Sequence, residues 1–227
     1  MDVLEEWMQD DSKFNNVEFY VANGGYLYPS NYMGTRWHRM FKGLYPGSFN
    51  PVHADHLAIH RAVQVQLGGK VAFEISVTNA DKGNISVEEV YKRLNQTPFI
   101  NDDIYVLITK AWLFEQKMRM FPGLSLIMGA DTFERFLDAK YLRPNGAQDT
   151  AKYDIQLMER QFEMLNTLDV DIIVAERNGR TVDKVLENCA MPWYNVEHRF
   201  KEVVNYKPLG LSSTAIRAGE QQAFDYR

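Results

Sequence analysis

Three histidines follow a tight turn in the stretch "LYPGSFNPVHADHLAIH", which runs from Leu44 to His60. His53, His56 and His60 are spaced three and four positions apart, so one helix would hold them close together. Imidazoles in such a cluster could ligate a metal ion, fill a core, or donate hydrogen bonds to phosphate oxygens. Other features of the sequence are needed to distinguish these three roles.

A metal site needs more than this cluster offers. A hydrolytic metal centre would also require a nearby carboxylate or a further histidine with its own supporting hydrogen bonds. Asp55 is adjacent, but we expect it to point to a different side of the helix from His56. His60 falls away from the apolar stripe, so we expect it to be solvated. A metal site is therefore disfavoured, and a purely structural role stays open.

The turn before the helix favours phosphate binding. Its Gly-Ser-Phe-Asn-Pro sequence leads into a helix start, where backbone N–H groups and the helix dipole attract anions. Gly47 lets the backbone approach a ligand without an intervening Cβ. Two imidazoles one turn apart could then donate hydrogen bonds to phosphate oxygens in a developing transition state.

A second motif is "LGLSSTAIRAG" at 209–219. Taken alone, Ser212 or Ser213 simply caps a helix. However, the hydroxyls of Ser213 and Thr214, the amides of the helix start and Arg217 one turn later would also form an anion cradle. Arginine offers two parallel hydrogen bonds to a phosphate group.

A third motif is "IMGADTFERF" at 127–136. Gly129 would allow a sharp exit from a buried strand. Asp131 would either cap the following helix or accept hydrogen bonds from a ribose or another polar ligand group.

The apolar pattern predicts alternating strands and helices from residue 40 onward. The expected strands are 40–45, 70–78, 104–109, 124–129 and 170–176, and the expected helices are 54–67, 87–94, 110–121, 131–141, 151–168 and one that opens at 212–213. On the first helix, Ala58, Ile59, Ala62, Val63 and Val65 would form the apolar face. Such alternation predicts an α/β fold with a parallel sheet covered on both faces. The turns at 46–56, 129–131 and 177–179 follow strands directly, so we expect them to meet at one sheet edge.

Bulk properties exclude several classes of protein. The 227-residue chain has a formal net charge of −5 and no run of Lys and Arg, which argues against nucleic acid as the main partner. Cys189 is the only cysteine, so we expect neither a disulfide framework nor a cysteine-based zinc site. The acidic N-terminus does not read as a secretory signal, and no apolar run is long enough to span a membrane. We therefore expect a cytoplasmic protein.

Together, "GSFNPVHADH", "MGADTFERF" and "LSSTAIR" resemble the signatures of the nucleotidylyltransferase superfamily. The nearest branch is the nicotinamide or nicotinate mononucleotide adenylyltransferases, and the resemblance covers roughly residues 40–219. The segments "FEISVTNADKGNISVEEVYKRL" and "IIVAERNGR" are similar to an uncharacterised branch of adenylyltransferase-like proteins, some of them fused to a competence-damage (CinA-like) domain. The resemblance implies a Rossmann-like doubly wound sheet, the nucleotidylyltransferase fold, over 40–227. Residues 1–39 would be an N-terminal extension, which we interpret as a structural cap, with an oligomer contact as the alternative.

The resemblance also implies roles for individual residues. His53 and His56 match the H-x-x-H phosphate site, and Ser213, Thr214 and Arg217 match the S-S-T-x-I-R motif that holds the ATP phosphates. A further set matches the nucleotide-binding positions of the family: Gly47, Ser48, Phe49, Gly129, Asp131 and Arg177. With His53, His56 and Arg217 as catalytic donors, the chain would transfer AMP from ATP to nicotinamide or nicotinate mononucleotide and release pyrophosphate. Mg²⁺ would bridge the ATP phosphates, with no side chain as a metal ligand.

The sequence departs from the family where Asp55 replaces a glycine of the usual H-x-G-H. That carboxylate would either repel incoming phosphate or help to hold a magnesium ion. The loop "TKAWLFEQK", where related enzymes grip the pyridine, does not map onto the family pattern. Two alternatives follow: another phosphorylated acceptor, such as phosphopantetheine or a phosphorylated alcohol with CTP, and a non-catalytic nucleotide-binding module. Homo-oligomerisation stays open.

Overall fold

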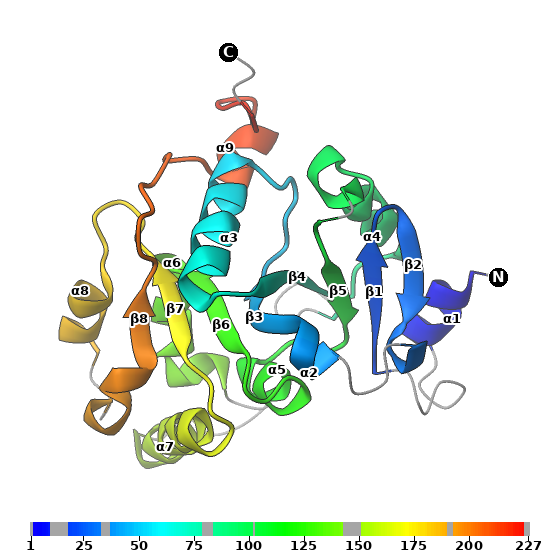
Figure 1. Cartoon of the computed structure of the whole chain (residues 1–227). Helices are drawn as coiled ribbons and strands as arrows, with labels where there is room; N and C mark the ends of the chain where they lie inside the picture. The colour runs from blue at the N-terminus through cyan, green and yellow to red at the C-terminus, as the bar shows by residue number, and fades with distance from the viewer. Residues whose placement is uncertain are drawn as a thin grey trace.

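Within the residues that the structure describes, the strands form one eight-stranded sheet in the order β2-β1-β5-β4-β3-β6-β7-β8 (Figure 1). The structure is a computed structural model that describes residues 2–9, 18–32, 37–78, 84–101, 103–142, 151–189 and 193–224. The strands are β1 (Phe19–Asn23), β2 (Tyr26–Pro29), β3 (Phe41–Pro46), β4 (Lys70–Ser76), β5 (Val106–Thr109), β6 (Ser125–Gly129), β7 (Ile172–Ala175) and β8 (Phe200–Glu202).

The six strands from β3 to β8 run parallel to one another. The chain starts this layer at β3, builds outward through β4 and β5, and then returns to the other side of β3 with β6, β7 and β8. The strand order therefore reverses between β3 and β6. In doubly wound sheets, this switch point opens a crevice at the carboxyl ends of the strands, where ligands bind. The expected α/β fold with a parallel sheet is confirmed at this level.

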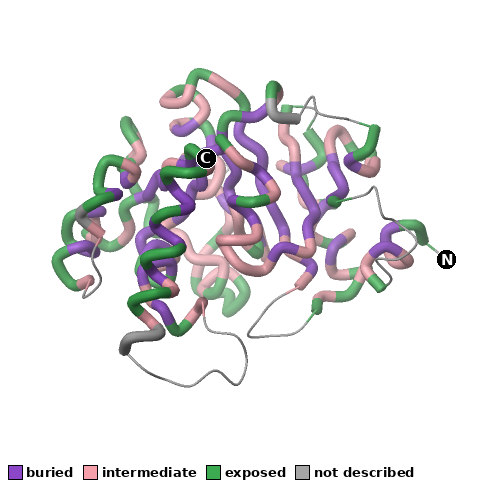
Figure 2. Tube along the Cα trace, turned by 90° about the horizontal axis from the view of Figure 1, so that it is seen from below, coloured by how far each residue is buried: buried purple, intermediate pink, exposed green. Residues whose placement is uncertain are grey.

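Helices cover both faces of the sheet. They are α1 (Val3–Gln9), α2 (Trp37–Met40), α3 (Ala54–Leu67), α4 (Val87–Leu94), α5 (Phe114–Met120), α6 (Ala130–Phe136), α7 (Ala151–Thr167), α8 (Val182–Glu187) and α9 (Ser213–Arg217), with 3₁₀ turns η2 (Ser30–Tyr32), η4 (Thr97–Ile100), η5 (Ala139–Tyr141) and η6 (Tyr194–Arg199). The side chains of α1, α3 and α4 enter one apolar cluster, and those of α5 to α8 enter another. Neighbouring strand residues such as Leu126 and Ile127 alternate between the two clusters. The strands consequently form a buried layer between exposed helical surfaces (Figure 2).

The N-terminal extension contributes a hairpin to the same sheet. β1 and β2 pair in antiparallel fashion around Gly24 and Gly25, and β1 then pairs antiparallel with β5. The helix α1 places Leu4 and Trp7 in the apolar cluster that α3 and α4 also join. Residues 19–23 and 26–29 are therefore strands of this sheet, whereas the Gly-, Asn- and Tyr-rich composition of 21–39 predicted turns or short irregular strands.

The observed boundaries of the helices agree best with the predicted ones where local sequence signals are strong. The helices α3 and α4 begin and end where the sequence predicted, at 54–67 and 87–94. The helix predicted at 110–121 begins only at Phe114, and the one predicted at 131–141 ends at Phe136, with η5 following. No helix in the described part of the chain is long and apolar enough to cross a membrane.

Candidate functional site

The turn that follows β3 is shaped by an aromatic ring. Phe49 is buried and adopts a φ of 45°, in the left-handed region that bulky residues rarely take. Its ring lies so close beneath Gly47 that a Cβ at position 47 would come within 2.6 Å of Cζ of Phe49. The Gly47 amide donates to the carbonyl of Glu74 on β4 at 2.9 Å, which fixes the start of the turn. Glycine at position 47 is therefore required by packing within the turn itself, while Ser48 is exposed.

The turn is also clasped by a side chain from beyond α4. The amide of Gln96 donates to the carbonyl of Phe49 at 2.8 Å and accepts from the N–H of Val52 at 2.7 Å. Between these points, the Asn50–Pro51 peptide bond is cis. Sequence analysis missed Gln96, and no local pattern marks it, because its partners lie 44 and 47 positions away.

His53 and His56 stack on each other at the start of α3. His53 is the N-cap residue and is 4% exposed, and the two ring centroids are 3.6 Å apart with an interplanar angle of 19°. The backbone N–H of His53 donates to Nδ1 of His56 at 3.3 Å. A neutral imidazole whose Nδ1 accepts carries its proton on Nε2, so His56 presents Nε2–H as its donor. Phe49 supports this ring with an edge contact at 5.0 Å between centroids.

Both imidazoles are held in the neutral form. Burial, helped by neighbouring His53 and the positive charge of Arg177, lowers the pKa of His56 to about 3. Burial also lowers the pKa of His53 to about 4, although the carboxylate of Asp55 acts in the opposite direction. Near neutral pH, the pair can thus donate hydrogen bonds without carrying charge. Nδ1 of His53 is buried and has no hydrogen-bond partner within the described residues, which leaves it available to a ligand or a water molecule.

His60 is a core residue, so the expectation that it is solvated was wrong. It is 3% exposed, its Nε2 donates to the carbonyl of Val71 on β4 at 2.8 Å, and its ring stacks on Phe73 at 4.5 Å. The apolar stripe is shifted accordingly, because Val65 is exposed where the sequence placed it on the buried face. The nearby backbone carbonyl of β4 makes the burial of a polar ring possible.

Asp55 is buried and engaged in hydrogen bonds, where the sequence suggested a carboxylate facing phosphate or magnesium. Its Oδ1 accepts from the hydroxyl of Tyr206 at 2.6 Å and from the backbone N–H of Leu209 at 3.2 Å. Burial and the bond to this carboxylate both raise the pKa of Tyr206.

The helix α9 lies against the turn that follows β3 (Figure 1). The hydroxyl of Ser213 donates to the carbonyl of Pro51 at 2.9 Å, and Arg217 donates to the carbonyl of Asn50. Arg217 also donates to the hydroxyl of Thr214 at 3.2 Å. The N-cap is Ser212, and its side chain makes no capping hydrogen bond, so helix capping alone does not account for the serines.

A second group lies across the switch point, after β6 and β7. One carboxylate oxygen of Asp131 accepts from Arg177 at 3.1 Å, and the other pairs with Arg180. Arg177 also donates to the carbonyl of Leu211 at 3.4 Å, which links this group to the segment before α9. Sequence analysis did not identify Arg180. A ribose that used Asp131 as its acceptor would have to share it with two arginines.

The sequence suggested that Gly129 is a glycine because the chain leaves a buried strand sharply there, but its backbone conformation does not require glycine. Its φ of −76° and ψ of 160° are open to any residue. A Cβ added there would meet no atom within 4 Å, so the backbone borders open space.

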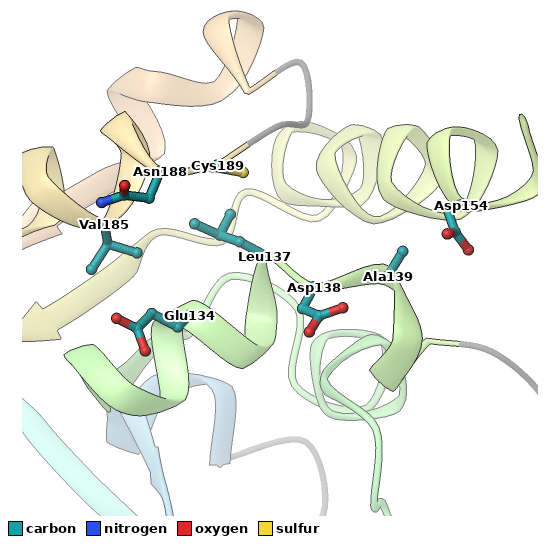
Figure 3. Close-up of a pocket in the computed structure, with 8 residues that line it drawn as sticks. All are labelled: Glu134, Leu137, Asp138, Ala139, Asp154, Val185, Asn188 and Cys189. Atoms are coloured by element: carbon teal, nitrogen blue, oxygen red, sulfur yellow. The ribbon is translucent and has the colours of Figure 1, made fainter. Parts of the chain in front are cut away.

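The structure thus brings the predicted residues into two neighbouring groups. The first holds Gly47, Ser48, Phe49, His53, His56, Ser213, Thr214 and Arg217, and the second holds Gly129, Asp131 and Arg177. A cavity of about 350 Å³ lies elsewhere, between α6, η5, α7 and α8 (Figure 3). Its lining contains none of the predicted site residues: Glu134, Leu137, Asp138, Ala139, Asp154, Val185, Asn188 and Cys189.

Among the described residues, no group of three or more His, Cys, Asp or Glu side chains is arranged to hold a metal ion. Comparison with known proteins adds no assignment, since no protein-family model and no curated protein matches the chain.

Proposed function

We propose that the chain is a nucleotidylyltransferase that transfers AMP from ATP to nicotinamide or nicotinate mononucleotide and releases pyrophosphate. The observation that carries the proposal is the contact of α9 with the turn after β3. Ser213 and Arg217 donate to the carbonyls of Pro51 and Asn50, in the turn that leads into the histidine pair, although more than 150 positions separate the two motifs.

The strand order supports a more specific assignment within the α/β class, the nucleotidylyltransferase fold. The motif turns follow β3 and β6, the two strands that flank the switch point of the sheet. In doubly wound sheets, a nucleotide binds at that point, with its phosphates near the first strand–helix turn. The histidine pair stands at that turn, where the first helix of the parallel layer begins.

In the proposed reaction, a phosphate oxygen of the mononucleotide attacks the α-phosphorus of ATP. A new P–O bond forms, the bond to the bridging oxygen breaks, and the electron pair leaves with pyrophosphate. The nucleophile is already an anion, so positioning and charge stabilisation account for most of the catalysis. Mg²⁺ would enter with ATP as part of the substrate and would offset part of the negative charge of its phosphates.

The side chains of the chain would act as hydrogen-bond donors. Nε2–H of His56 would donate to the phosphate oxygens that gain negative charge in the transition state. Arg217 would supply a permanent positive charge for the departing pyrophosphate. His53 would orient His56 through its stacked ring and its backbone N–H.

One contact favours a second candidate, a nucleotide-binding module without turnover. The backbone N–H of Ala54, in the first turn of α3, donates to the carbonyl of Ala223 at 3.0 Å. This amide would otherwise be a donor for phosphate at the helix start, and the C-terminal segment uses it instead.

Pyrophosphate release from MgATP tests the proposal, with nicotinamide mononucleotide and nicotinate mononucleotide in parallel reactions. Wild type and His56→Ala are compared, with Arg119→Ala as a control that removes an exposed arginine from α5. Release with either mononucleotide that is lost only in His56→Ala supports the proposal and names the acceptor. ATP binding without release would favour the non-catalytic module, and release with phosphopantetheine or with CTP and a phosphorylated alcohol would change the acceptor.

A further inference from the structure

The segment 203–212, which we call the strap, connects β8 to α9 and lies along α3 (Figure 1). At one end of α3, the side chain of Gln66 donates to the carbonyl of Glu202 at 3.0 Å and accepts from the N–H of Val204 at 3.0 Å. At the other end, Asp55 accepts from Tyr206 and Leu209. The strap is therefore fixed to α3 by two polar side chains, one near each end of the helix.

The position of α9 depends on such polar contacts. No residue of α9 is fully buried, and Ala215 and Ile216 are only partly so, so apolar packing holds this helix less firmly than it holds α3 or α4. Its own side chains Ser213 and Arg217 donate to backbone carbonyls of the turn after β3, and the flanking carbonyls of Leu211 and Ala223 accept from Arg177 and from the N–H of Ala54. Leu209, four residues before Ser213, is where the strap last bonds to α3.

Asp55 is well suited to anchor the strap. It is 7% exposed, and one of its oxygens accepts two hydrogen bonds, so removing it would leave the partly buried hydroxyl of Tyr206 and the backbone N–H of Leu209 without their acceptor. It also lies between His53 and His56, in the first turn of α3. Asp55 thus joins the segment before α9 to the helical turn that carries the histidine pair.

We propose that Asp55 is a positioning residue that fastens the strap to α3, so that Ser213, Thr214 and Arg217 meet the phosphates of the nucleotide beside His56. The inference rests on the proposed function for its effect on nucleotide binding. Asp55 acts here as a hydrogen-bond acceptor within the protein. A role in repelling phosphate or in holding magnesium would depend on its charge.

Two substitutions separate hydrogen bonding from charge. Asp55→Ala removes the acceptor, whereas Asp55→Asn removes the charge and keeps a carbonyl oxygen at the position of Oδ1. Asp183→Ala is the matched control, because Asp183 is an exposed acid in the first turn of another helix, α8. Tyr206→Phe removes the same hydrogen bond from the strap side and keeps the inference testable if Asp55→Ala does not fold.

The readouts are the Kd of MgATP by calorimetry, the KM values of both substrates, and amide hydrogen exchange across 206–219. We expect Asp55→Ala to raise the Kd and KM of ATP about tenfold or more, in line with the loss of a hydrogen bond to a charged group. The KM of the mononucleotide should change much less, and amides of the strap and α9 should exchange faster. Asp55→Asn should restore ATP affinity to within about threefold of wild type, the small difference reflecting the loss of charge.

Unchanged ATP affinity and exchange in Asp55→Ala would overturn the inference. The inference would also be overturned if Asp55→Asn bound ATP as weakly as Asp55→Ala and had an altered Mg²⁺ requirement. That result would assign the charge of Asp55 a direct role in binding MgATP. If the wild type neither binds ATP nor releases pyrophosphate, the proposed function fails. Hydrogen exchange in Asp55→Ala and Tyr206→Phe then decides on its own whether Asp55 holds α9.

Discussion

Arg217 donates a hydrogen bond to the backbone carbonyl of Asn50, across 167 positions of sequence. The contact joins the last helix of the chain to the turn that follows the central strand of the parallel layer. Arg217 is exposed, so it can turn from this carbonyl to a phosphate group without crossing the core. The proposed chemistry depends on this pairing, because neither motif alone surrounds a triphosphate.

Substitution of Arg217 should impair turnover more than folding. We expect Arg217→Ala to lower kcat/KM for ATP on the order of 10²-fold, since a charged donor to the departing pyrophosphate is lost. Arg217→Lys should recover only part of the activity, because lysine cannot form two parallel hydrogen bonds. The melting temperature should hardly change, as is usual for an exposed residue. Steady-state kinetics and thermal unfolding measure the two effects, with Arg119→Ala as control. Equal losses of kcat/KM in Arg217→Ala and Arg119→Ala would contradict the role of Arg217 as a phosphate donor.

His56 should act through one nitrogen. His56→Ala removes the Nε2–H donor and should reduce kcat about 10²–10³-fold. His56→Gln places an amide N–H near the position of Nε2 and should retain more activity than alanine, although it loses the acceptor for the backbone N–H of His53. Single-turnover rates at saturating MgATP provide the comparison. An unchanged rate in His56→Ala would remove this residue from the mechanism.

The same histidines should make stability depend on pH. An unfolded histidine has a pKa of about 6.5, whereas burial lowers those of His53 and His56 to about 4 and about 3. Between about pH 6.5 and pH 4, the unfolded chain binds protons that the folded chain does not, so the free energy of unfolding falls as the pH falls. Each histidine can contribute up to about 1.4 kcal/mol per pH unit.

Urea denaturation at several pH values between 7 and 4.5 would measure this slope. His56→Gln should flatten it, and His198→Gln, which alters an exposed histidine of η6, is the control substitution. Equal slopes in wild type and His56→Gln would show that other groups cause the acid sensitivity.

Local signals account for much of what the sequence predicted correctly. The helix α4 begins after Ser86, whose hydroxyl accepts from the N–H of Glu89 at 3.3 Å, and α3 ends at Gly68 with a φ of 61°. Capping residues and glycines of this kind depend on a few neighbouring positions, so sequence inspection finds them. The motif turns follow β3, β6 and β7, as the alternation of strands and helices predicted.

Distant partners account for the errors. His60 is outside the apolar stripe by periodicity, and only the carbonyl of Val71 on the adjacent strand makes its burial favourable. The role of Asp55 depends on Tyr206 and Leu209, which are 151 and 154 positions away. The β1–β2 hairpin did carry a local signal, two glycines between apolar runs, but its place beside β5 is a long-range pairing.

The buried pair of Lys117 and Glu74 should be sensitive to removal of one partner. Nζ of Lys117 lies 2.8 Å from both carboxylate oxygens of Glu74, and both residues are almost fully buried. Lys117→Met leaves a buried carboxylate without its cation and should destabilise the protein by about 3–5 kcal/mol. Adding Glu74→Gln should recover part of this loss, because the uncompensated charge is gone. Chemical denaturation of the single and double variants tests the coupling, and a double variant no more stable than Lys117→Met would contradict it.

Gln96 should support catalysis without touching a substrate. Its amide donates to the carbonyl of Phe49 and accepts from the N–H of Val52, so it holds both sides of the turn after β3. Gln96→Glu keeps the size and the acceptor but places a carboxylate oxygen against the carbonyl of Phe49. We expect kcat to fall about tenfold or more as the turn shifts, because small misplacements at a reacting centre are costly.

Gln9→Glu, at an exposed position of α1, controls for the added charge. Kinetics at pH 7 and pH 5 would separate the effect of charge from that of shape, since protonation of the introduced carboxylate restores a hydrogen-bond donor. Recovery of activity at the lower pH in Gln96→Glu alone would support the role of Gln96 in holding the turn. Identical pH profiles for the two variants would reject it.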